Sequence, residues 1–275
     1  MDILLAKHLG FCMGVKKATE AVYHLIDNGK KAKISTFGPL IHNRLVLDYF
    51  AKKGVGVIDD PENADGVVVI RAHGIHPDIR KKLEKNNIEL IDATCPRVLN
   101  SQKKVREAAE KGLSVIIVGD KDHGEVQGIA GYAKNVYIIE NRKEAENISI
   151  KLPALLISQT TYGKEEYDSI SVILKARFPG IEIADSICPA TSERQKALID
   201  MANKVDAIIV IGGKNSANTL RLYETALKLG KKVWHIESEN EIPEEVKNFS
   251  IIGITAGAST PDWVIKKVAD KLKIY

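Results

Sequence analysis

The chain contains three similar stretches, and each of them begins at a cysteine. Cys12, Cys95 and Cys188 are 83 and 93 residues apart. "IDATCP" and "ADSICP" lead into the second and third cysteines, each placing an acid three residues before the cysteine and a proline after it. All three following segments place apolar residues three and four positions apart among Lys, Glu and Gln, which predicts an amphipathic helix. Such a long internal repeat restricts the fold more than any single motif does.

Each predicted helix is followed by further elements in the same order. A strand ends in a polar loop ("KISTFGPLIHN", "SVIIVGDKDHGE", "AIIVIGGKNSAN"), and a helix and a short strand come next. A second apolar strand then ends in another polar loop ("VVVIRAHG", "ALLISQTTY", "IIGITAGAST"). Short strands that alternate with helices predict βαβ units with mostly parallel sheets. We therefore expect three α/β repeats, with the N-terminal strand "DILLA" completing the third: residues 13–95, 96–188, and 189–275 together with 1–12.

Polar residues follow the carboxyl ends of these strands, where parallel α/β sheets bind ligands. Two groups recur at similar distances from the preceding cysteine: His42, His123 and Ser216 in the first loops, and His73, Thr160 and Ser259 in the second. If the repeats pack about a pseudo-threefold axis with these edges inward, the three cysteines converge on one point. The expected architecture is then trefoil-like around a central cluster.

The three cysteines make a poor disulfide framework, because their number is odd and their spacing is wide. Structural zinc prefers a fourth protein ligand and closely spaced pairs, and neither CxxC nor HxxxH is present. A [4Fe–4S] cluster takes thiolate ligands, and three of them leave one iron open to a substrate. A buried structural role is the ordinary alternative for one cysteine, but the repeat register of all three favours the cluster. A zinc-stabilised scaffold remains the competing interpretation.

The remaining polar residues suit acid catalysis and anion binding. Glu125 stands two residues after His123 in "DHGE", where a carboxylate can relay a proton; the alternative is a surface glutamate. Hydroxyls and amides near helix N-termini can cradle a phosphate group, and the candidates are Thr160, Thr161, Thr191, Ser216, Asn218 and Ser259. Neither a Walker loop nor a GxGxxG fingerprint occurs, so we expect electrons to come from another protein. A binding module for phosphorylated metabolites is the second alternative.

Composition and charge narrow the class of protein. The net charge is only +4, which argues against a dedicated nucleic-acid-binding protein. The N-terminus lacks the features of a signal peptide, and runs such as "AIIVI" are too short to cross a bilayer. We therefore expect a cytoplasmic protein that binds no membrane.

The motifs together resemble the 4-hydroxy-3-methylbut-2-enyl diphosphate reductase family. The resemblance spans residues 10 to 260 and rests on the following segments: "GFCMGV", "GPLIHN", "RAHG", "DATCP", "DHGE", "SQTT", "CPATSERQ", "KNSAN" and "GAS". It implies an iron–sulfur oxidoreductase that removes an allylic hydroxyl with two electrons and two protons. The products would be isopentenyl and dimethylallyl diphosphate, in the last step of the non-mevalonate route to isoprenoids. A ferredoxin or flavodoxin would be the electron donor.

The resemblance also implies roles for individual residues. Cys12, Cys95 and Cys188 would ligate the cluster, and Glu125 would relay protons with the aid of Thr160. The diphosphate would be held by His42, His73, His123, Ser216, Asn218 and Ser259. One position departs from the family pattern, because Ala217 stands where a second serine is usual. A hydrogen bond to a charged group is worth about 1.5–3 kcal/mol, so we expect the change to tune affinity rather than abolish function.

Overall fold

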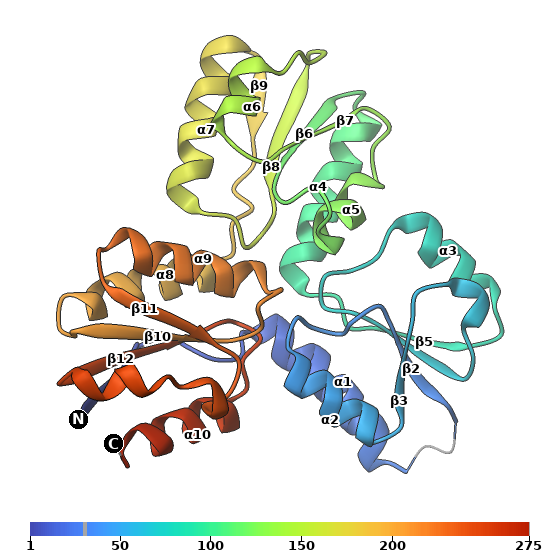
Figure 1. Ribbon diagram of the computed structural model, residues 1–275. Helices are drawn as coiled ribbons and strands as arrows, with labels where there is room; N and C mark the ends of the chain where they lie inside the picture. Colours follow the sequence, from blue (N-terminus) through green and yellow to red (C-terminus); the bar gives the residue numbers. More distant parts are fainter. Residues whose placement is uncertain (30–31, 275) are drawn as a thin grey trace. The chain divides into compact units, whose positions relative to one another are not determined.

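Three four-stranded sheets form the framework of the protein (Figure 1). The computed structural model describes residues 1–29 and 32–274. Every strand pairs in parallel with its neighbours, so the prediction of three parallel α/β repeats is confirmed. The strands are β1 (Asp2–Leu5), β2 (Ile34–Phe37), β3 (Val55–Ile58), β4 (Val67–Ile70), β5 (Glu89–Asp92), β6 (Ser114–Val118), β7 (Val136–Ile139), β8 (Ala154–Ser158), β9 (Ile181–Ile183), β10 (Ala207–Ile211), β11 (Lys232–Ile236) and β12 (Ile251–Ala256).

The three sheets share one strand order. Two of them run β3-β2-β4-β5 and β7-β6-β8-β9, so the second strand of a repeat lies at one edge and the fourth at the other. The third sheet runs β11-β10-β12-β1, and β1 takes the place of the fourth strand. Asp2 pairs with Ile251 and Leu5 with Ile254, which confirms that the N-terminal strand completes the third repeat.

Helices connect the strands, as right-handed βαβ crossovers require for parallel pairing. Short 3₁₀ segments cover Pro61–Asn63, Glu239–Glu241 and Glu244–Asn248. The α-helices are α1 (Met13–Asp27), α2 (Arg44–Lys52), α3 (Pro77–Lys85), α4 (Pro96–Glu110), α5 (Gly124–Ala130), α6 (Arg142–Asn147), α7 (Lys164–Arg177), α8 (Pro189–Ala202), α9 (Ala217–Lys228) and α10 (Asp262–Leu272).

Helices cover both faces of the sheet that contains β6 and β8. Successive side chains of a strand point to opposite faces, so the four residues after Ser114 in "SVIIV" are all apolar and are buried on both faces. Ile116 and Val118 pack against α6 and α7, whereas Val115 and Ile117 pack against α4 and α5. The sheet of β10 and β12 is built alike, with α8 and α9 on one face and α10 on the other.

The sheet of β2 and β4 has a smaller core. Phe37, Val68 and Ile70 pack with Leu83 of α3 on one face. Helices α1 and α2 contact each other through Tyr23 and Phe50, whose rings meet edge to face with centroids 5.1 Å apart. All four β4 residues are buried, as a central parallel strand requires.

By internal contacts the chain divides into two compact units. The first comprises Met1–Val15, His42–Tyr49 and Pro189–Tyr275, and it holds the sheet completed by β1. The second comprises Lys16–Ile41 and Phe50–Cys188, and it holds the other two sheets. Three domains with limits at the cysteines remain a prediction, as does a trefoil-like arrangement.

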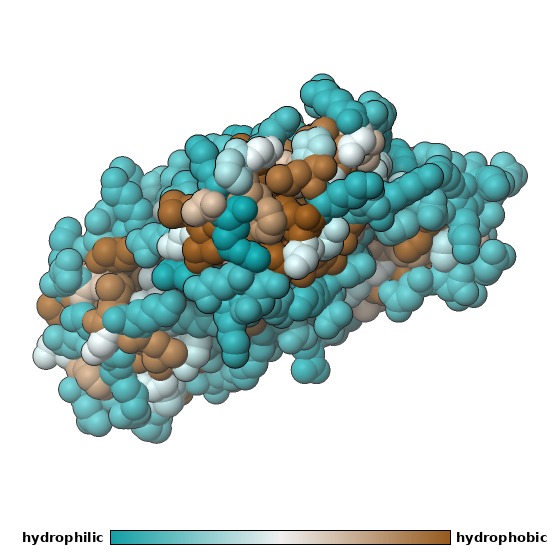
Figure 2. Space-filling model, turned by 90° about the horizontal axis from the view of Figure 1, so that it is seen from above, coloured by the Kyte–Doolittle hydropathy of each residue, from teal (hydrophilic) through white to brown (hydrophobic). Residues whose placement is uncertain are grey.

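The face shown in Figure 2 carries hydrophilic residues, with hydrophobic residues in groups between them. Ion pairs one helical turn apart, such as Lys103 with Glu107, contribute to this charged surface. Within the described part of the chain, none of the helices has the length and apolar character needed to cross a bilayer.

Candidate functional site

Each cysteine stands directly before the N-terminus of a helix. Helices α1, α4 and α8 begin one residue after Cys12, Cys95 and Cys188, so the three predicted helices are confirmed. Each cysteine also follows the fourth strand of its sheet, namely β1, β5 or β9. All three are partly buried, and within the described residues they form no disulfide. Three copies of one strand–cysteine–helix junction therefore present thiols at helix N-termini.

The backbone of each cysteine is tied to the third strand of its own sheet. The N–H of Cys12 donates to the Ala258 carbonyl (3.1 Å), and that of Cys95 donates to the Ala72 carbonyl (2.9 Å). The N–H of Cys188 donates to the Thr160 carbonyl (2.8 Å). Each acceptor lies two residues beyond β12, β4 or β8. The same hydrogen bond thus fixes all three cysteines.

This hydrogen bond also sets the register between the repeats. Thr160 corresponds to Ala72 and Ala258, since all three accept from a cysteine N–H. His73 and Ser259, one residue further along, therefore correspond to Thr161 rather than to Thr160. Spacing from the preceding cysteine grouped Thr160 with them because the segments between the cysteine and this strand differ in length.

The N-terminus of a helix begins directly after each of these cysteines. Unpaired backbone N–H groups and the helix dipole stabilise a negative charge at this position. The N–H of Val15 approaches the Cys12 sulfur at 3.5 Å, which is such a contact. Thiolates are ligands for soft metals and iron–sulfur clusters, so the three residues fit a metal–thiolate centre chemically.

Glu125 is a buried carboxylate in the first turn of α5, with 2% of its surface exposed. Its Oε1 accepts from the backbone N–H of Thr160 (2.6 Å), and its Oε2 accepts from the Thr160 hydroxyl (2.9 Å). The structure therefore brings together the two residues predicted to relay protons. Since the Thr160 carbonyl accepts the Cys188 N–H, one threonine connects the buried acid to a cysteine loop.

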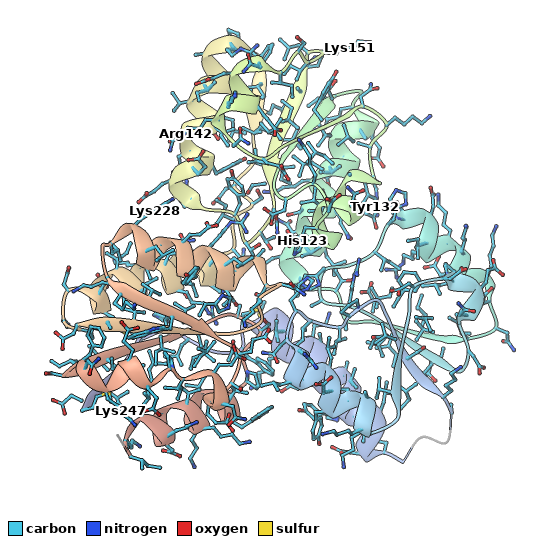
Figure 3. The ribbon with its side chains drawn as sticks, viewed as in Figure 1. His123, Tyr132, Arg142, Lys151, Lys228 and Lys247 are labelled. Carbon is cyan, nitrogen blue, oxygen red and sulfur yellow. The ribbon has the colours of Figure 1, made fainter. Side chains whose placement is uncertain are left out.

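His123 lies at the N-cap of α5 (Figure 3). Its Nδ1 accepts from the N–H of Glu125 at 3.1 Å, which fixes both the ring and the start of the helix. The ring of His73 meets the His123 ring edge to face, with centroids 5.3 Å apart. These two predicted residues, from loops of two different sheets, are therefore neighbours within the second unit.

In the first unit, the loops after β10 and β12 also come together. Ser216 is the N-cap of α9, and its hydroxyl accepts from the Thr219 N–H (3.4 Å). The Ser259 hydroxyl lies 3.0 Å from the His42 carbonyl and 3.5 Å from the Ser216 hydroxyl. Three of the predicted anion-binding residues thus share one hydrogen-bonded cluster.

Asn218 and Thr191 occupy first turns of helices. Asn218 lies in the first turn of α9 with 5% of its surface exposed, and its Nδ2 has no hydrogen-bond partner among the described residues. A buried amide without a partner costs about 1–3 kcal/mol, so this donor suits an external acceptor. Ala217, beside it, is buried and offers no hydroxyl. Thr191 is buried in the first turn of α8, shortly after Cys188.

Comparison with known proteins decides the family. The model of the LytB protein family matches residues 3–273. The chain belongs to the LytB family. The 4-hydroxy-3-methylbut-2-enyl diphosphate reductase of Treponema denticola is 45% identical, with 99% of both chains covered. The reductase of the same name from Caldanaerobacter subterraneus is 41% identical and covers 99% of this chain and 97% of its own.

Solved structures of LytB relatives share the fold. The E-1-hydroxy-2-methyl-but-2-enyl-4-diphosphate reductase of Plasmodium falciparum matches with a TM-score of 0.93 at 30% identity, covering 99% of this chain and 88% of that one. A second solved reductase, described as the terminal enzyme of the non-mevalonate pathway, matches with a TM-score of 0.74 at 33% identity over the full length of both chains. As a member of this family, the chain is an oxidoreductase.

Arg71 is a further residue of the candidate site, and the sequence motifs did not single it out. It precedes His73 by two residues, and its Nε donates to the Gly74 carbonyl (3.2 Å). A Cβ added at Gly38 or Gly124 would lie 2.4–2.5 Å from the guanidinium nitrogens, so the guanidinium lies close against both glycines. Burial lowers the pKa of Arg71, and the charge of Asp59 opposes this effect. The "RAHG" motif contained the arginine, but nothing in the sequence indicated its contact with "DHGE".

Gln159 is a second residue that the sequence did not single out. Its Oε1 accepts from the Asp120 N–H (3.0 Å), and its Nε2 donates to the Thr161 hydroxyl (3.1 Å). The fully buried amide therefore joins the loop after β6 to the loop after β8. Gly119 accommodates it, because a Cβ there would lie 2.8 Å from the glutamine side chain.

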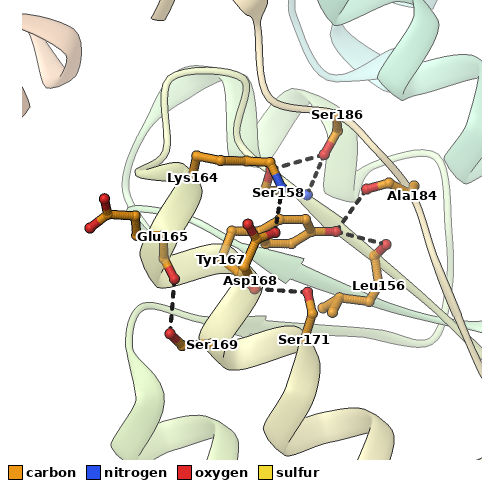
Figure 4. A network of polar contacts seen from close by, with 10 residues as sticks. All are labelled: Leu156, Ser158, Lys164, Glu165, Tyr167, Asp168, Ser169, Ser171, Ala184 and Ser186. Atoms are coloured by element: carbon orange, nitrogen blue, oxygen red, sulfur yellow. Dashed lines mark hydrogen bonds and ion pairs between the residues drawn. The ribbon is translucent and has the colours of Figure 1, made fainter. Parts of the chain in front are cut away.

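A polar network fixes the segment that leads to Cys188 (Figure 4). The Ser186 hydroxyl accepts from the Ser158 N–H (2.8 Å) and lies 2.9 Å from the Ser158 hydroxyl. The Tyr167 hydroxyl contacts the carbonyls of Leu156 (3.3 Å) and Ala184 (2.8 Å). Burial raises the pKa of Tyr167, so it remains a neutral donor. These contacts attach the segment before Cys188 to β8 at Ala184 and at Ser186, the residues on either side of Asp185.

Proposed function

We propose that the chain catalyses the reductive dehydroxylation of 4-hydroxy-3-methylbut-2-enyl diphosphate to isopentenyl and dimethylallyl diphosphate. The C–O bond of the allylic alcohol breaks, the oxygen leaves as water, and a new C–H bond forms with two electrons and two protons. The observation that carries this proposal is the set of hydrogen bonds made by Thr160. Its N–H and hydroxyl bind a buried carboxylate, while its carbonyl binds the backbone of a cysteine.

The three cysteines would hold a [4Fe–4S] cluster. The donor set fits this group, because each thiol is partly buried, lies at a helix N-terminus and has a fixed backbone. When bound, such a cluster supplies electrons and, with only three protein ligands, one Lewis-acidic iron. The equivalent positions of the three cysteines, each before a helix and held by the same backbone hydrogen bond, support a shared role rather than three unrelated structural roles.

Glu125 would deliver the protons through Thr160. A buried carboxyl group in contact with a hydroxyl can pass a proton along that hydrogen bond and recover another from solvent. Because the Thr160 hydroxyl donates to Oε2, its oxygen retains lone pairs for a further partner such as the substrate. His123 orients the start of α5 and therefore the backbone of Glu125, which gives it a catalytic role through positioning.

The diphosphate would be held by hydroxyl, amide and imidazole groups. In the first unit these are Ser216, Asn218, Ser259 and His42, among which the Asn218 amide has no acceptor in the described part of the chain. Thr191 would add a hydroxyl from the first turn of α8. In the second unit the donors are His73, His123 and Thr161. The N-termini of α5 and α9 add a favourable electrostatic field for an anion.

Anaerobic reconstitution tests this function. The protein is purified without oxygen, supplied with iron and sulfide, and mixed with the substrate and a chemical reductant. We expect visible iron–sulfur absorption, a spectral change on adding the substrate, and both isoprenoid diphosphates as products. A colourless protein carrying zinc would contradict the proposal, and so would a cluster-loaded protein that leaves the substrate unchanged. Activity with reduced ferredoxin or flavodoxin would identify the physiological donor.

A further inference from the structure

A basic side chain on the helix after each cysteine donates to the backbone of a loop that carries another cysteine. Lys17 of α1, which follows Cys12, contacts the Thr94 carbonyl at 3.1 Å, one residue before Cys95. Lys104 of α4 contacts the Asp185 carbonyl at 3.1 Å, three residues before Cys188. We call these pairs, together with the third pair described next, the cation–carbonyl contacts.

Arg194 of α8, which follows Cys188, makes the third cation–carbonyl contact. Its Nη2 donates to the Gly10 carbonyl at 2.6 Å, two residues before Cys12. Its Nη1 donates to the Ala190 carbonyl at 2.8 Å, on its own helix. Only 5% of the Arg194 surface is exposed. Burying a guanidinium is costly unless hydrogen bonds compensate for the lost water, so the position is strongly specified.

The loop that Arg194 contacts has little freedom of its own. Gly10 has a φ of +79°, which side chains rarely allow. A Cβ at Gly10 would lie 3.0 Å from the Asp262 carboxylate and 3.2 Å from the Ile265 side chain. The path of the chain into Cys12 is therefore set from two sides, by α10 and by the guanidinium.

The three contacts follow one rule around the repeats. The helix after Cys12 holds the Cys95 loop, the helix after Cys95 holds the Cys188 loop, and the helix after Cys188 holds the Cys12 loop. The basic residues stand five, nine and six positions after their cysteines, so repetition of one sequence position does not explain the pattern. Each contact also places a positive charge within a few residues of a thiol.

We propose that Arg194, with Lys17 and Lys104, positions the cysteine ligands and supplies positive charge to the iron–sulfur centre. The inference rests on the proposed function, since it assumes that the three cysteines bind one cluster. Partners that orient metal ligands from behind typically change metal affinity about 10–100-fold when removed. Cluster potentials depend on nearby charge and hydrogen bonds. Loss of a nearby positive charge disfavours the reduced cluster and lowers its potential.

The test compares Arg194→Met, Lys17→Met and Lys104→Met with matched controls. Arg177→Met removes another arginine that donates to two carbonyls, those of Ala145 and Ile148, away from any cysteine. Lys231→Met removes a lysine that donates to the Val205 carbonyl at 2.8 Å. Each reconstituted protein is titrated electrochemically with detection by electron paramagnetic resonance, and iron release to a chelator is measured.

We expect Arg194→Met to hold iron about 10–100-fold more weakly and to have a lower cluster potential than the wild type. Lys17→Met and Lys104→Met should shift the potential in the same direction by less, because their side chains are more exposed. Arg194→Lys should have a cluster potential close to that of the wild type, since it retains the charge. It should release iron faster than the wild type but more slowly than Arg194→Met. Both control variants should match the wild type.

The outcomes separate the two proposals. A wild-type protein that assembles no cluster contradicts the proposed function itself. A wild type that assembles one, with Arg194→Met equal to Arg177→Met in potential and iron release, overturns this inference alone. If circular dichroism shows that Arg194→Met does not fold, then Lys17→Met, Lys104→Met and Arg194→Lys decide the matter. Unshifted potentials in Lys17→Met and Lys104→Met, together with wild-type iron retention in Arg194→Lys, would equally overturn the inference.

Discussion

Thr160 connects three parts of the site by three different atoms. Its N–H and hydroxyl contact the two oxygens of Glu125, and its carbonyl accepts from Cys188. A carboxylate that accepts two hydrogen bonds in a buried place has a single well-defined orientation. The geometry therefore suits Glu125 to transfer a proton in a fixed direction rather than to act as a mobile surface acid.

Replacing Glu125 by Gln should lower turnover about 10²–10⁴-fold, because general acid catalysis contributes this much. The cluster spectrum and the binding of the diphosphate should change little, since neither depends on the acid proton. Rapid-quench kinetics with the reconstituted enzyme measure the rate.

Glu140→Gln is the control for this substitution. The Glu140 carboxylate is exposed and accepts the Lys121 N–H at 2.9 Å, outside the candidate site. Its turnover should equal that of the wild type. Unchanged turnover in Glu125→Gln as well would mean that protons reach the substrate by another route.

At the scale of the element, the turn from strand to cysteine differs between two similar motifs. In "IDATCP", Asp92 accepts from the Thr94 N–H (2.9 Å) and from Arg80 of α3 (2.6 Å). In "ADSICP", the hydroxyl of Ser186 binds β8 instead. Among the hydrogen bonds of the described residues, the side chain of the acid at this position therefore accepts in "IDATCP" but not in "ADSICP".

Asp92 makes the stability of the folded protein depend on pH. Burial raises its pKa, but hydrogen bonds from Thr94 and Arg80 outweigh this, and the net pKa lies below the usual value. A lowered folded-state pKa stabilises the protein above the unfolded pKa of about 3.9, and this contribution disappears as the pH falls through the folded value. Asp92→Asn should therefore cost about 1–2 kcal/mol of unfolding free energy at neutral pH.

Urea unfolding of the apoprotein at several pH values measures this effect. The curves for the wild type and Asp92→Asn should converge below the usual aspartate pKa. Asp270→Asn is the control, because Asp270 forms an exposed ion pair with Lys273 (3.1 Å) and should change stability by less than about 1 kcal/mol. A difference that stays constant from neutral to acid pH would show that Asp92 does not act through its charge.

The elements could be predicted from the sequence much better than the contacts between them. Cysteine spacing and apolar periodicity predicted the three repeats and the place of the N-terminal strand β1 in the third sheet. Both predictions follow from local sequence patterns. The contacts of Arg71, Gln159 and Arg194 were not predicted, because their partners are distant along the chain. The correspondence of Thr161 with His73 needed a hydrogen bond that spacing does not reveal.

At the scale of the whole molecule, the repeats place the three cysteines in equivalent positions. In three sheets with one strand order, the segment after the fourth strand contains a cysteine, and the same backbone hydrogen bond holds each cysteine. A repeat that was merely structural would have no reason to keep this residue at all three junctions. Equivalent junctions predict equivalent effects when any one cysteine is replaced.

Each of Cys12→Ser, Cys95→Ser and Cys188→Ser should fold, lose the iron–sulfur spectrum and lose turnover to the same extent. Serine keeps the backbone hydrogen bond and nearly the same volume, so the loss of a soft ligand is the only large change. Iron content, visible spectra and product formation are measured after identical reconstitution, and circular dichroism of the apoproteins checks the fold. Matching Cys→Ala variants should behave alike, because the missing thiolate and not the new hydroxyl causes the loss. A single cysteine whose replacement leaves both the cluster and full activity would exclude that residue from the ligand set and break the equivalence of the repeats.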